Sequence, residues 1–446
     1  MTSVPFPVPH ATVPFWRTEL HVLDSHQSTP ELPEKQDVVI IGAGFAGAAL
    51  AYYLSEQDTS VPKRSITILE AREACSGATG RNGGHLRPDI FNGVAAHMKT
   101  HGLDAANNVA TFELENAEAL TNLIKSEEID CDLRPVVSGA AFVDEAEAAD
   151  AKKLWDDMLE KGSPALQQVT YYGPEDAERV SGIKGALALY TFPAAVLWPY
   201  KMVMHLLAAA VAAGVNLQTH TPVHAVSPEA DSEGYWTLET ARGAIKARHI
   251  VFATNAYTSG LLPEYANTIL PCLGTCARMV ATASAGPPPL PSCGIASKSP
   301  NTIHSYWGAR PDGSFIVGGA SSYRDKREFW YRNFDDSALI GPSIKFFAQW
   351  AGKSLVGWEE AEMKIENIWT GVMGYTSDDL PHVGAVPGKK GLYICAGFVG
   401  HGMPNVLLSA KAVAKLLRDD TPLTESGVPA CYETSSERLR GARQTA

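Results

Sequence analysis

The feature that most constrains this chain is a glycine-rich segment that follows a run of branched apolar residues. Residues 38–41, Val-Val-Ile-Ile, are typical of a strand that is buried on both faces. Gly42, Gly44 and Gly47 then match the pattern G-x-G-x-x-G. In that pattern the glycines allow a tight turn, a close approach to a pyrophosphate and close packing of a helix on a strand. The helix expected next would direct its first N–H groups toward a phosphate.

A second predicted strand supports this interpretation. Residues 65–69, Ser-Ile-Thr-Ile-Leu, are rich in branched side chains and lead directly into Glu70. A carboxylate at the end of the second strand is placed to accept hydrogen bonds from a ribose. Strand, glycine turn, helix, strand and acid in this order predict a dinucleotide site. A glycine-rich turn without a ligand is the alternative.

Size and charge narrow the function further. With 446 residues the chain is expected to hold more than one domain. A formal net charge of −12 argues against nucleic acid or an anionic membrane as a partner. The first residues do not resemble a signal peptide, and no apolar run is long enough for a bilayer. We therefore expect a cytoplasmic protein, and no feature of the sequence predicts a particular oligomeric state.

The cysteines point the same way. Seven cysteines are scattered along the chain, which fits a reducing compartment. Cys272 and Cys276 lie close together, but no second pair or histidine cluster accompanies them. They are interpreted as plain cysteines, and no metal site is predicted.

The pattern of strands and helices predicts an α/β fold with two domains. A Rossmann-like domain is assembled from residues 37–93, 196–264 and 366–420. A substrate domain, an inserted α+β unit on an antiparallel sheet, takes residues 94–195 and 265–365. Residues 1–36 are expected to form an arm on the surface, and residues 421–446 a polar C-terminal tail. The predicted helices are 107–129, 146–161, 199–213 and 405–417, and the main later strands are 138–143, 243–247, 249–256, 278–283, 302–308, 313–319 and 392–397.

Two further stretches carry residues suited to chemistry. The first follows Glu70 closely and reads Ser76-Gly77-Ala78-Thr79-Gly80-Arg81-Asn82-Gly83-Gly84-His85-Leu86-Arg87. Its glycines let the backbone lie against a planar ring or a pyrophosphate, whereas a flexible loop is the alternative. The second is Gly400-His401-Gly402-Met403, at a predicted helix start after a buried strand. Such a start can stabilise negative charge on a bound ring, although a simple turn is the alternative.

These stretches together resemble the D-amino-acid-oxidase-type family of flavoproteins, the group that includes glycine, sarcosine and gamma-glutamylputrescine oxidases. Further matching pieces are Val223 after a helix–strand unit, the strand end Ala253-Thr254, residues 312–319 and residues 376–381. They span nearly the whole chain in the order of the family. The form Arg81-Asn82-Gly83-Gly84 is most similar to the putrescine-catabolism branch.

The resemblance implies that the chain is an FAD-dependent enzyme acting on an amine or amino acid. Hydride would pass from a substrate C–N carbon to flavin N5, giving an imine and, with O2 as acceptor, hydrogen peroxide. The alternatives are a flavin dehydrogenase with another acceptor, an NAD-dependent dehydrogenase, and a flavin-binding protein with another or no catalytic role. The residues implied to hold FAD are Gly42, Ala43, Gly44, Phe45, Ala46, Gly47, Glu70, Ala71, Arg72, Ala78, Thr79, Gly80, Arg81, Asn82, Gly83, Gly84, His85, Leu86, Val223, Ala253, Thr254, Gly400, His401, Gly402 and Met403.

The candidates for the substrate pocket are fewer. They are Arg87, Tyr306, Trp307 and His401, with Arg310 and Trp369 as further possibilities. Arg87 can pair with a carboxylate in a bidentate manner, although a structural ion pair is an equal alternative. Because neighbouring strand residues point to opposite faces, only one of Tyr306 and Trp307 can face a pocket.

Three departures from the family pattern qualify these expectations. Sarcosine oxidases attach their flavin to a cysteine in the segment that corresponds to residues 369–375. This chain has no cysteine there, so FAD is expected to bind without a covalent link, and a link through His85 is the alternative. Sarcosine oxidases carry a lysine on the equivalent strand, and this lysine promotes the reaction of the flavin with O2. The segment Phe315-Ile316-Val317 holds no lysine, which predicts a slow reaction with O2. After Gly402 stand Met403 and Pro404 instead of a lysine for a substrate carboxylate. A small amino acid with a free α-carboxylate is therefore a less favoured substrate.

Overall fold

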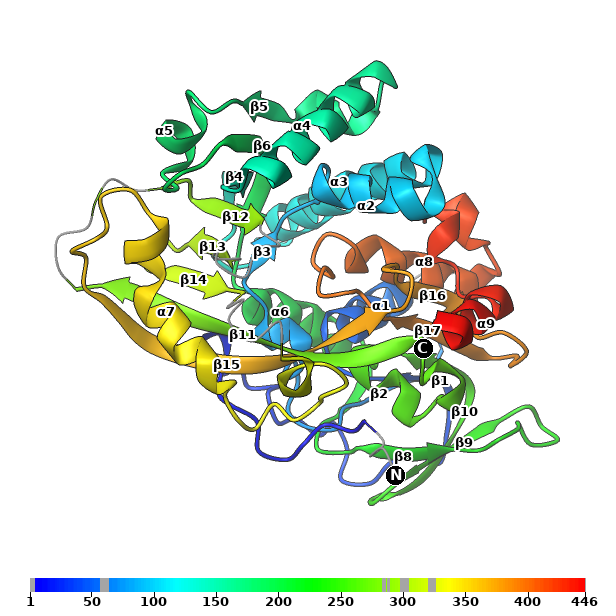
Figure 1. Cartoon of the computed structure of the whole chain (residues 1–446). Coiled ribbons are helices and arrows are strands. Elements are labelled where there is room, and N and C mark those ends of the chain that lie inside the picture. The colour runs from blue at the N-terminus through cyan, green and yellow to red at the C-terminus, as the bar shows by residue number, and fades with distance from the viewer. Residues whose placement is uncertain are drawn as a thin grey trace.

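Two β-sheets flanked by helices form the framework of the protein (Figure 1). The computed structural model describes residues 5–56, 64–282, 286, 289–296, 305–319 and 326–445. The first three residues of the strand expected at 302–308 lie outside these ranges.

The first sheet carries the strand that leads into the glycine turn. Its order is β16-β17-β10-β1-β2-β7, and β9 adds the β8–β9 hairpin to β10. The five central strands from β17 to β7 run parallel, whereas β16 is antiparallel to β17. The bounds are β1 (Lys35–Ile41), β2 (Ile66–Leu69), β7 (Asn216–Gln218), β8 (Val223–Val226), β9 (Trp236–Thr240), β10 (Gly243–Phe252), β16 (His382–Ala385) and β17 (Leu392–Ala396).

The prediction that β1 is buried on both faces is confirmed. Val38 and Ile40 point into the core shared with helices α1 (Phe45–Ser55), α6 (Pro199–Ala212) and α8 (Val406–Asp419). Val39 and Ile41 point into a second core, formed with β9 and β10. Residues that alternate between two apolar cores explain why the strand reads as an unbroken branched run.

The second sheet has the order β15-β11-β14-β13-β12-β4-β6-β3, with β5 beside β6. Its longest strands, β11 and β15, pair along their whole length and cross the middle of Figure 1. The pairs are antiparallel, as expected for a domain built on an antiparallel sheet, except β12 and β4, which run parallel. The bounds are β3 (His85–Leu86), β4 (Arg134–Phe142), β5 (Thr170–Tyr172), β6 (Ala188–Val196), β11 (Ile269–Ala281), β12 (Ser292–Ala296), β13 (Ser305–Ala309), β14 (Phe315–Gly318) and β15 (Met363–Thr376).

Of the remaining helices, α9 packs beside the first sheet, and the others lie around the second sheet or connect it to the first. The long helix α3 contacts both α2 and α8, so it bridges the helical layers of the two halves. Helix α7 lies across β11 and β15 (Figure 1). Their bounds are α2 (Asn92–His101), α3 (Leu103–Ser126), α4 (Glu145–Glu160), α5 (Ala177–Ser181), α7 (Gly341–Ser354) and α9 (Ser436–Thr445). None of the helices within the described ranges combines the length and the apolar content needed to cross a bilayer.

The structure corrects several details of the predicted elements. The two strands expected at 243–247 and 249–256 form one continuous strand, β10, which pairs with β9 through its first half and with β1 along most of its length. Strands β6 and β15 were not expected, because neither shows a regular alternation of apolar and polar residues. Strands β3 and β15 fall in segments assigned to the Rossmann-like domain but pair within the second sheet. The domain limits therefore stay a prediction.

Both chain ends are packed more closely than expected. The side chain of Trp16, in the predicted surface arm, is only 1% exposed. In the predicted polar tail, Tyr432 is buried and its hydroxyl donates to Asn405 Oδ1 (2.7 Å). Apolar anchors within polar segments explain both differences.

Candidate active site

A single continuous cavity of about 1180 Å³ lies where the parallel strands of the first sheet end. Its volume exceeds the range of about 300–1,000 Å³ that is usual for small-molecule pockets. Gly42, Glu70 and Val223 line one region, and Arg87 and Tyr306 line another. The cavity is therefore large enough for a long ligand with a second molecule beside it.

The glycine turn at the first region has the shape that a pyrophosphate requires. Gly42 has φ +108°, and a Cβ there would lie 2.7 Å from Ala253 O. A Cβ at Gly47 would overlap the carbonyl oxygen of Gly42. At Gly44 a Cβ would meet only Thr79 Oγ1, at 3.2 Å, so its outer side is open. Gly42 and Gly47 are needed for the fold, and Gly44 leaves room for a ligand.

Glu70 holds this turn while facing the cavity. Its Oε2 accepts the N–H of Ala43 (2.8 Å), and its Oε1 accepts the N–H of Arg72 (2.9 Å). An ionised carboxylate has about four acceptor positions, so two remain for the hydroxyls of a ribose. Helix α1 begins just after the turn, and its first N–H, from Phe45, donates to Thr79 Oγ1 (3.0 Å).

The 76–86 loop is fixed by Arg81, which points away from the loop into the protein. Its Nε donates to Ser76 O (2.8 Å) and its Nη1 to Thr370 O (2.8 Å). The buried carboxylate of Asp336 lies 3.4 Å from Arg81 and 3.0 Å from Arg72. Burial lowers the pKa of Arg81 to about 10, so it remains charged near neutrality. Arg81 therefore anchors the loop to β15.

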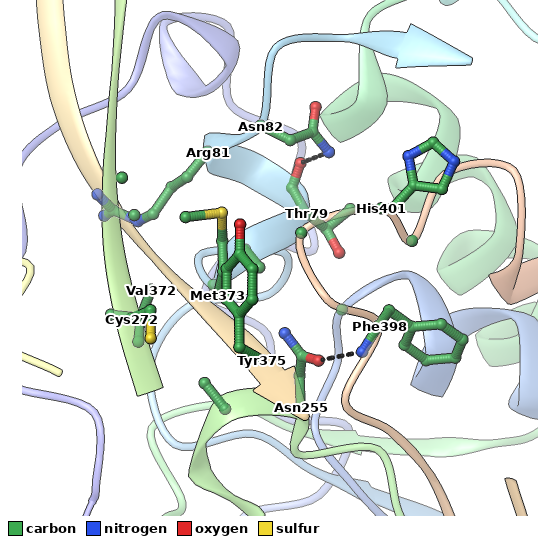
Figure 2. Close-up of a pocket in the computed structure, with 18 of the residues that line it drawn as sticks. Thr79, Arg81, Asn82, Asn255, Cys272, Val372, Met373, Tyr375, Phe398 and His401 are labelled. Atoms are coloured by element: carbon green, nitrogen blue, oxygen red, sulfur yellow. Dashed lines mark hydrogen bonds between the residues drawn. The ribbon is translucent and has the colours of Figure 1, made fainter. Parts of the chain in front are cut away.

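Asn82 sets the shape of the same loop. Its Nδ2 donates to Thr79 O (3.0 Å), the bond drawn in Figure 2. Its Oδ1 accepts the N–H of Gly84 (2.8 Å). Asn82 and Gly83 then line the cavity, with backbone and small atoms facing a ligand. This arrangement suits a flat ring laid against the loop.

His85 lines the cavity as a neutral ring. Burial lowers the pKa of its imidazole to about 4. Its Nε2 faces Gly308 of β13. The ring packs edge to face against Tyr306, with 5.6 Å between centroids. His85 therefore contributes shape and not charge to this wall.

Of the two adjacent aromatic candidates, Tyr306 faces the cavity. Its ring lies over Gly318, where a Cβ would overlap it, and close to Gly83. Trp307 points to the opposite face, where it is fully buried, packs on Trp350 and donates to Leu290 O (3.0 Å). The proposal of Trp307 as a pocket residue was wrong, because strand alternation turns it into the core.

Arg87 extends into the cavity wall. Its Nε donates to Ser138 Oγ (2.9 Å) and its Nη2 to Gly139 O (3.2 Å). Its guanidinium also lies over the ring of Phe192, 4.8 Å from the centroid. Within the described residues no carboxylate pairs with Arg87, and its Nη1 makes no hydrogen bond. The alternative that Arg87 forms a structural ion pair therefore does not hold among the described residues.

His401 lies in the glycine turn before α8 and pairs with a residue that was not predicted. Its Nε2 is 3.0 Å from Oε2 of Glu113, a side chain of α3 that is 5% exposed. Glu113 also accepts the N–H of Asp89 (2.7 Å) and a bond from Asn405 Nδ2 (3.0 Å). Burial alone would lower the pKa of His401, but the charge and hydrogen bond of Glu113 raise it above its ordinary value.

Strand β15 supplies a wall that sequence reasoning missed. Met373 and Tyr375 point from it toward the loop carrying Thr79 and the turn carrying His401 (Figure 2). A Cβ at Gly400 would lie 3.1 Å from Met373 Sδ and 3.3 Å from the Tyr375 hydroxyl. Recognising residues 363–376 as a strand would have been the signal, since 371, 373 and 375 share one face.

Asn255 joins the strand ends that surround this wall. It has φ +42°, and its Oδ1 accepts the N–H groups of Gly397 (3.1 Å) and Phe398 (3.3 Å), the second of which Figure 2 shows. The amide thus holds the turn that leads to His401 against the end of β10.

Most of the residues predicted to hold a cofactor line the cavity. Those that do are Gly42, Gly44, Phe45, Ala46, Glu70, Ala71, Arg72, Ala78, Thr79, Arg81, Asn82, Gly83, His85, Val223, Ala253, Thr254, Gly400, His401, Gly402 and Met403. Those that do not are Ala43, Gly47, Gly80, Gly84 and Leu86, and the pocket candidates Trp307, Arg310 and Trp369 are also absent from the wall. The second group supports the wall from behind: Trp369, for example, donates to Arg81 O (2.7 Å).

Comparison with known proteins identifies the family that shares this arrangement. The sequence profile described as FAD dependent oxidoreductase matches residues 37–416. The chain belongs to the FAD-dependent oxidoreductase family. A gamma-glutamylputrescine oxidoreductase of Escherichia coli is 26% identical over 395 residues, which cover 86% of this chain and 84% of that protein. A glycine oxidase of Bacillus subtilis is 24% identical over 397 residues, covering 86% and 92%.

A solved structure shares the fold of this oxidoreductase. The glycine oxidase of Geobacillus kaustophilus superposes with a TM-score of 0.70 over 91% of this chain and 99% of that chain, at 20% identity. The cofactor is FAD, and the open glycine turn, Glu70 and the flat 76–86 loop fit its pyrophosphate, ribose and ring system. No cluster of metal-ligating side chains occurs among the residues that the structure describes.

Proposed function

We propose that this FAD-dependent oxidoreductase oxidises a C–N bond of an amine or amino acid. The observation that carries the proposal is Arg87, whose Nη1 has no protein partner in the described chain while the residue lines the cavity wall. His401, whose pKa Glu113 raises, lines the same cavity. The Arg87 guanidinium suits a substrate that carries a carboxylate in addition to its amine. The names of two relatives, a gamma-glutamylputrescine oxidoreductase and a glycine oxidase, support this substrate class.

FAD, when bound, supplies the chemistry by accepting a hydride at N5 from the substrate carbon, and the resulting imine hydrolyses in water. The protein's own task is to bind and orient the substrate. Arg87 would hold its carboxylate, while Tyr306 and Tyr375 would shape the space beside the reacting carbon. A protein base is not required, provided that the amine enters in its neutral form.

FAD is proposed to bind without a covalent link. Met373 occupies the wall at the segment where a family cysteine would stand, and Cys272 faces it from β11. Burial raises the pKa of the Cys272 thiol to about 11, so little of the reactive thiolate is present near neutrality. Acid precipitation should therefore release all of the flavin into the supernatant, and flavin that stays with the protein would contradict this part of the proposal.

The reduced flavin is proposed to react slowly with O2, giving hydrogen peroxide, and a dehydrogenase that passes electrons to another acceptor is the alternative. The segment expected to carry an oxygen-promoting lysine is Phe315-Ile316-Val317 in β14, whose side chains are all buried and apolar. No positive charge at these positions would attract or stabilise reduced oxygen species.

The test is anaerobic mixing of the holoenzyme with matched candidate substrates, followed by its visible spectrum. The set contains amines, amino acids and polyamine conjugates, each with and without a distal carboxylate. The proposal expects flavin bleaching by at least one amine, and faster bleaching by its carboxylate-bearing form. Failure of the whole set to bleach the flavin favours a protein with another or no catalytic role.

Readmission of air tests the acceptor in the same cuvette. The flavin colour should return slowly, and an added artificial acceptor should restore it quickly. Rapid recovery with stoichiometric hydrogen peroxide would identify an oxidase instead.

A further inference from the structure

The segment before β1 lies outside the matched family profile, which begins at residue 37, yet it reaches the cavity. Phe6 and Pro7 both line the cavity wall. The ring of Phe6 meets that of His224 edge to face, with 6.5 Å between centroids. His224 follows Val223, so Phe6 lies in the region of the cavity where Glu70 faces the expected ribose.

Further along, the same segment joins the charged cluster behind the cavity. The Thr12 hydroxyl accepts a hydrogen bond from Arg81 Nη1 (3.0 Å). The backbone N–H of Thr12 donates to Asp336 O (2.8 Å). The carbonyl of Val8 accepts from Arg72 Nη1 (3.2 Å). Both arginines belong to segments that line the cavity. The N-terminal segment is therefore bonded to the wall at two separate points.

A third point is Trp16, which supports the 76–86 loop from behind. Its indole N–H donates to Asn82 O (2.6 Å). Its ring fills the space at Gly84, where a Cβ would lie 2.6 Å from it. The ring is in turn packed against Trp198, with 5.7 Å between centroids. Asn82 faces the cavity, whereas Trp16 does not line it.

From these contacts we propose that residues 6–16 are part of the FAD site. Phe6 and Pro7 form the wall beside the nucleotide end of the cofactor, and Trp16 positions the 76–86 loop against the ring system. The segment thus does more than cover the surface: it holds two walls of the cavity in place through these contacts. Walls that are already ordered bind a ligand more tightly, because less conformational freedom is lost on binding.

The test measures FAD affinity and not turnover. Holoenzyme is diluted stepwise, and the recovery of flavin fluorescence gives the dissociation constant of FAD. Phe6→Ala should raise this constant about tenfold, because it removes apolar contact area beside the cofactor. Trp16→Phe keeps a ring at this position but loses the bond to Asn82, and should raise the constant about fivefold.

A control outside the proposed segment separates local from general effects. Val22 lies beyond residues 6–16 and is 88% exposed, so Val22→Ala should leave the dissociation constant unchanged. Because Phe6 is only partly buried, Phe6→Ala is not expected to prevent folding, and far-ultraviolet circular dichroism verifies this. A dissociation constant for Phe6→Ala or Trp16→Phe within twofold of the wild type overturns the proposal. The readout is independent of the substrate, so it also stands apart from the proposed C–N oxidation.

Discussion

At the scale of single residues, charge and not shape distinguishes the groups that line the cavity. Arg87 carries a cation whose Nη1 is unbonded within the described chain, and His401 is biased toward its cationic form. His85, equally close to the cavity, is biased toward the neutral form by burial. The guanidinium of Arg87 on the cavity wall predicts selection of an anionic substrate, and the lowered pKa of His85 predicts a pH-dependent stability.

Replacing Arg87 tests the carboxylate contact. Arg87→Ala should raise KM for a carboxylate-bearing amine at least tenfold, because a charged hydrogen-bonded pair contributes about 1.5–3 kcal/mol. KM for the matching amine without the carboxylate should change little. Steady-state kinetics with both substrates measure the difference, and Arg134→Ala, at the exposed start of β4, is the control. Equal changes for the two substrates would remove Arg87 from the substrate site.

Replacing His85 tests its predicted neutrality. The pKa of His85 is about 4 in the folded protein, below the ordinary value of 6.5 that the unfolded chain has. Between these values the unfolded state binds the proton, so stability falls as pH drops from 6.5 to 4, by up to about 1.4 kcal/mol per pH unit. In His85→Asn the free energy of unfolding, measured by urea unfolding at a series of pH values, should fall less steeply by up to about 1.4 kcal/mol per pH unit. The exposed His10→Asn is the control, and an unchanged slope in His85→Asn contradicts the assignment.

At the scale of elements, helix α3 connects the substrate side of the molecule to the turn before α8. Its Glu113 bonds His401, and its Asn116 Oδ1 accepts the N–H of Leu408 (2.8 Å). These two side chains lie three residues apart, on one face of the helix. A carboxylate with three donors is firmly held, so α3 determines both the position and the protonation of His401.

Glu113→Gln should shift the pH dependence of substrate binding. The groups that act on His401 are Glu113 and Asp89, which favour its cation, and Arg87, which opposes it. Loss of the Glu113 charge lowers the pKa of His401, so affinity for an anionic substrate should decline at lower pH than in the wild type. KM measured across pH gives the profile, and the exposed Glu115→Gln on the same helix is the control. A profile that coincides with the wild type would show that His401 does not act as a cation.

At the scale of the whole molecule, a buried ionic cluster connects the two sheets behind the cavity. Arg72 follows β2 of the first sheet, Arg81 precedes β3, and both meet Asp336, whose side chain is 1% exposed. The N-terminal segment adds Thr12 to the same cluster. The walls on either side of the cavity are thereby connected by charge-assisted hydrogen bonds as well as by packing.

Asp336→Asn should destabilise the protein by about 3–5 kcal/mol, because two buried arginines lose the carboxylate that balances them. Urea unfolding of the holoenzyme measures the change. Asp335→Asn is the matched control, since its side chain is exposed one residue earlier. A loss below about 1 kcal/mol would mean that the cluster is not important for joining the sheets.

The sequence predicted what is encoded locally. The glycine turn, Glu70 and the 76–86 loop lie within 50 residues, and each glycine has a steric reason visible in the pattern. The contact of Glu113 with His401 joins positions 288 residues apart, and nothing local to either marks it. The prediction for Trp307 was wrong because the alternation of side chains along a strand defines two faces of the sheet but does not show which face lines the cavity. Residues 1–36 were assigned to a surface arm, but Trp16 and Leu23 within this segment are buried, and no regular spacing of apolar residues marks them.

The central claim is that this oxidoreductase removes hydride from a carbon bonded to nitrogen. The most direct measurement is an anaerobic single turnover of the holoenzyme with an amine that bleaches the flavin, followed by product analysis. The account predicts one equivalent of carbonyl product and one of released amine or ammonia for each flavin reduced, and no bleaching by the corresponding hydroxy compound. Bleaching by the hydroxy compound, or flavin reduction without cleavage of the C–N bond, would contradict it.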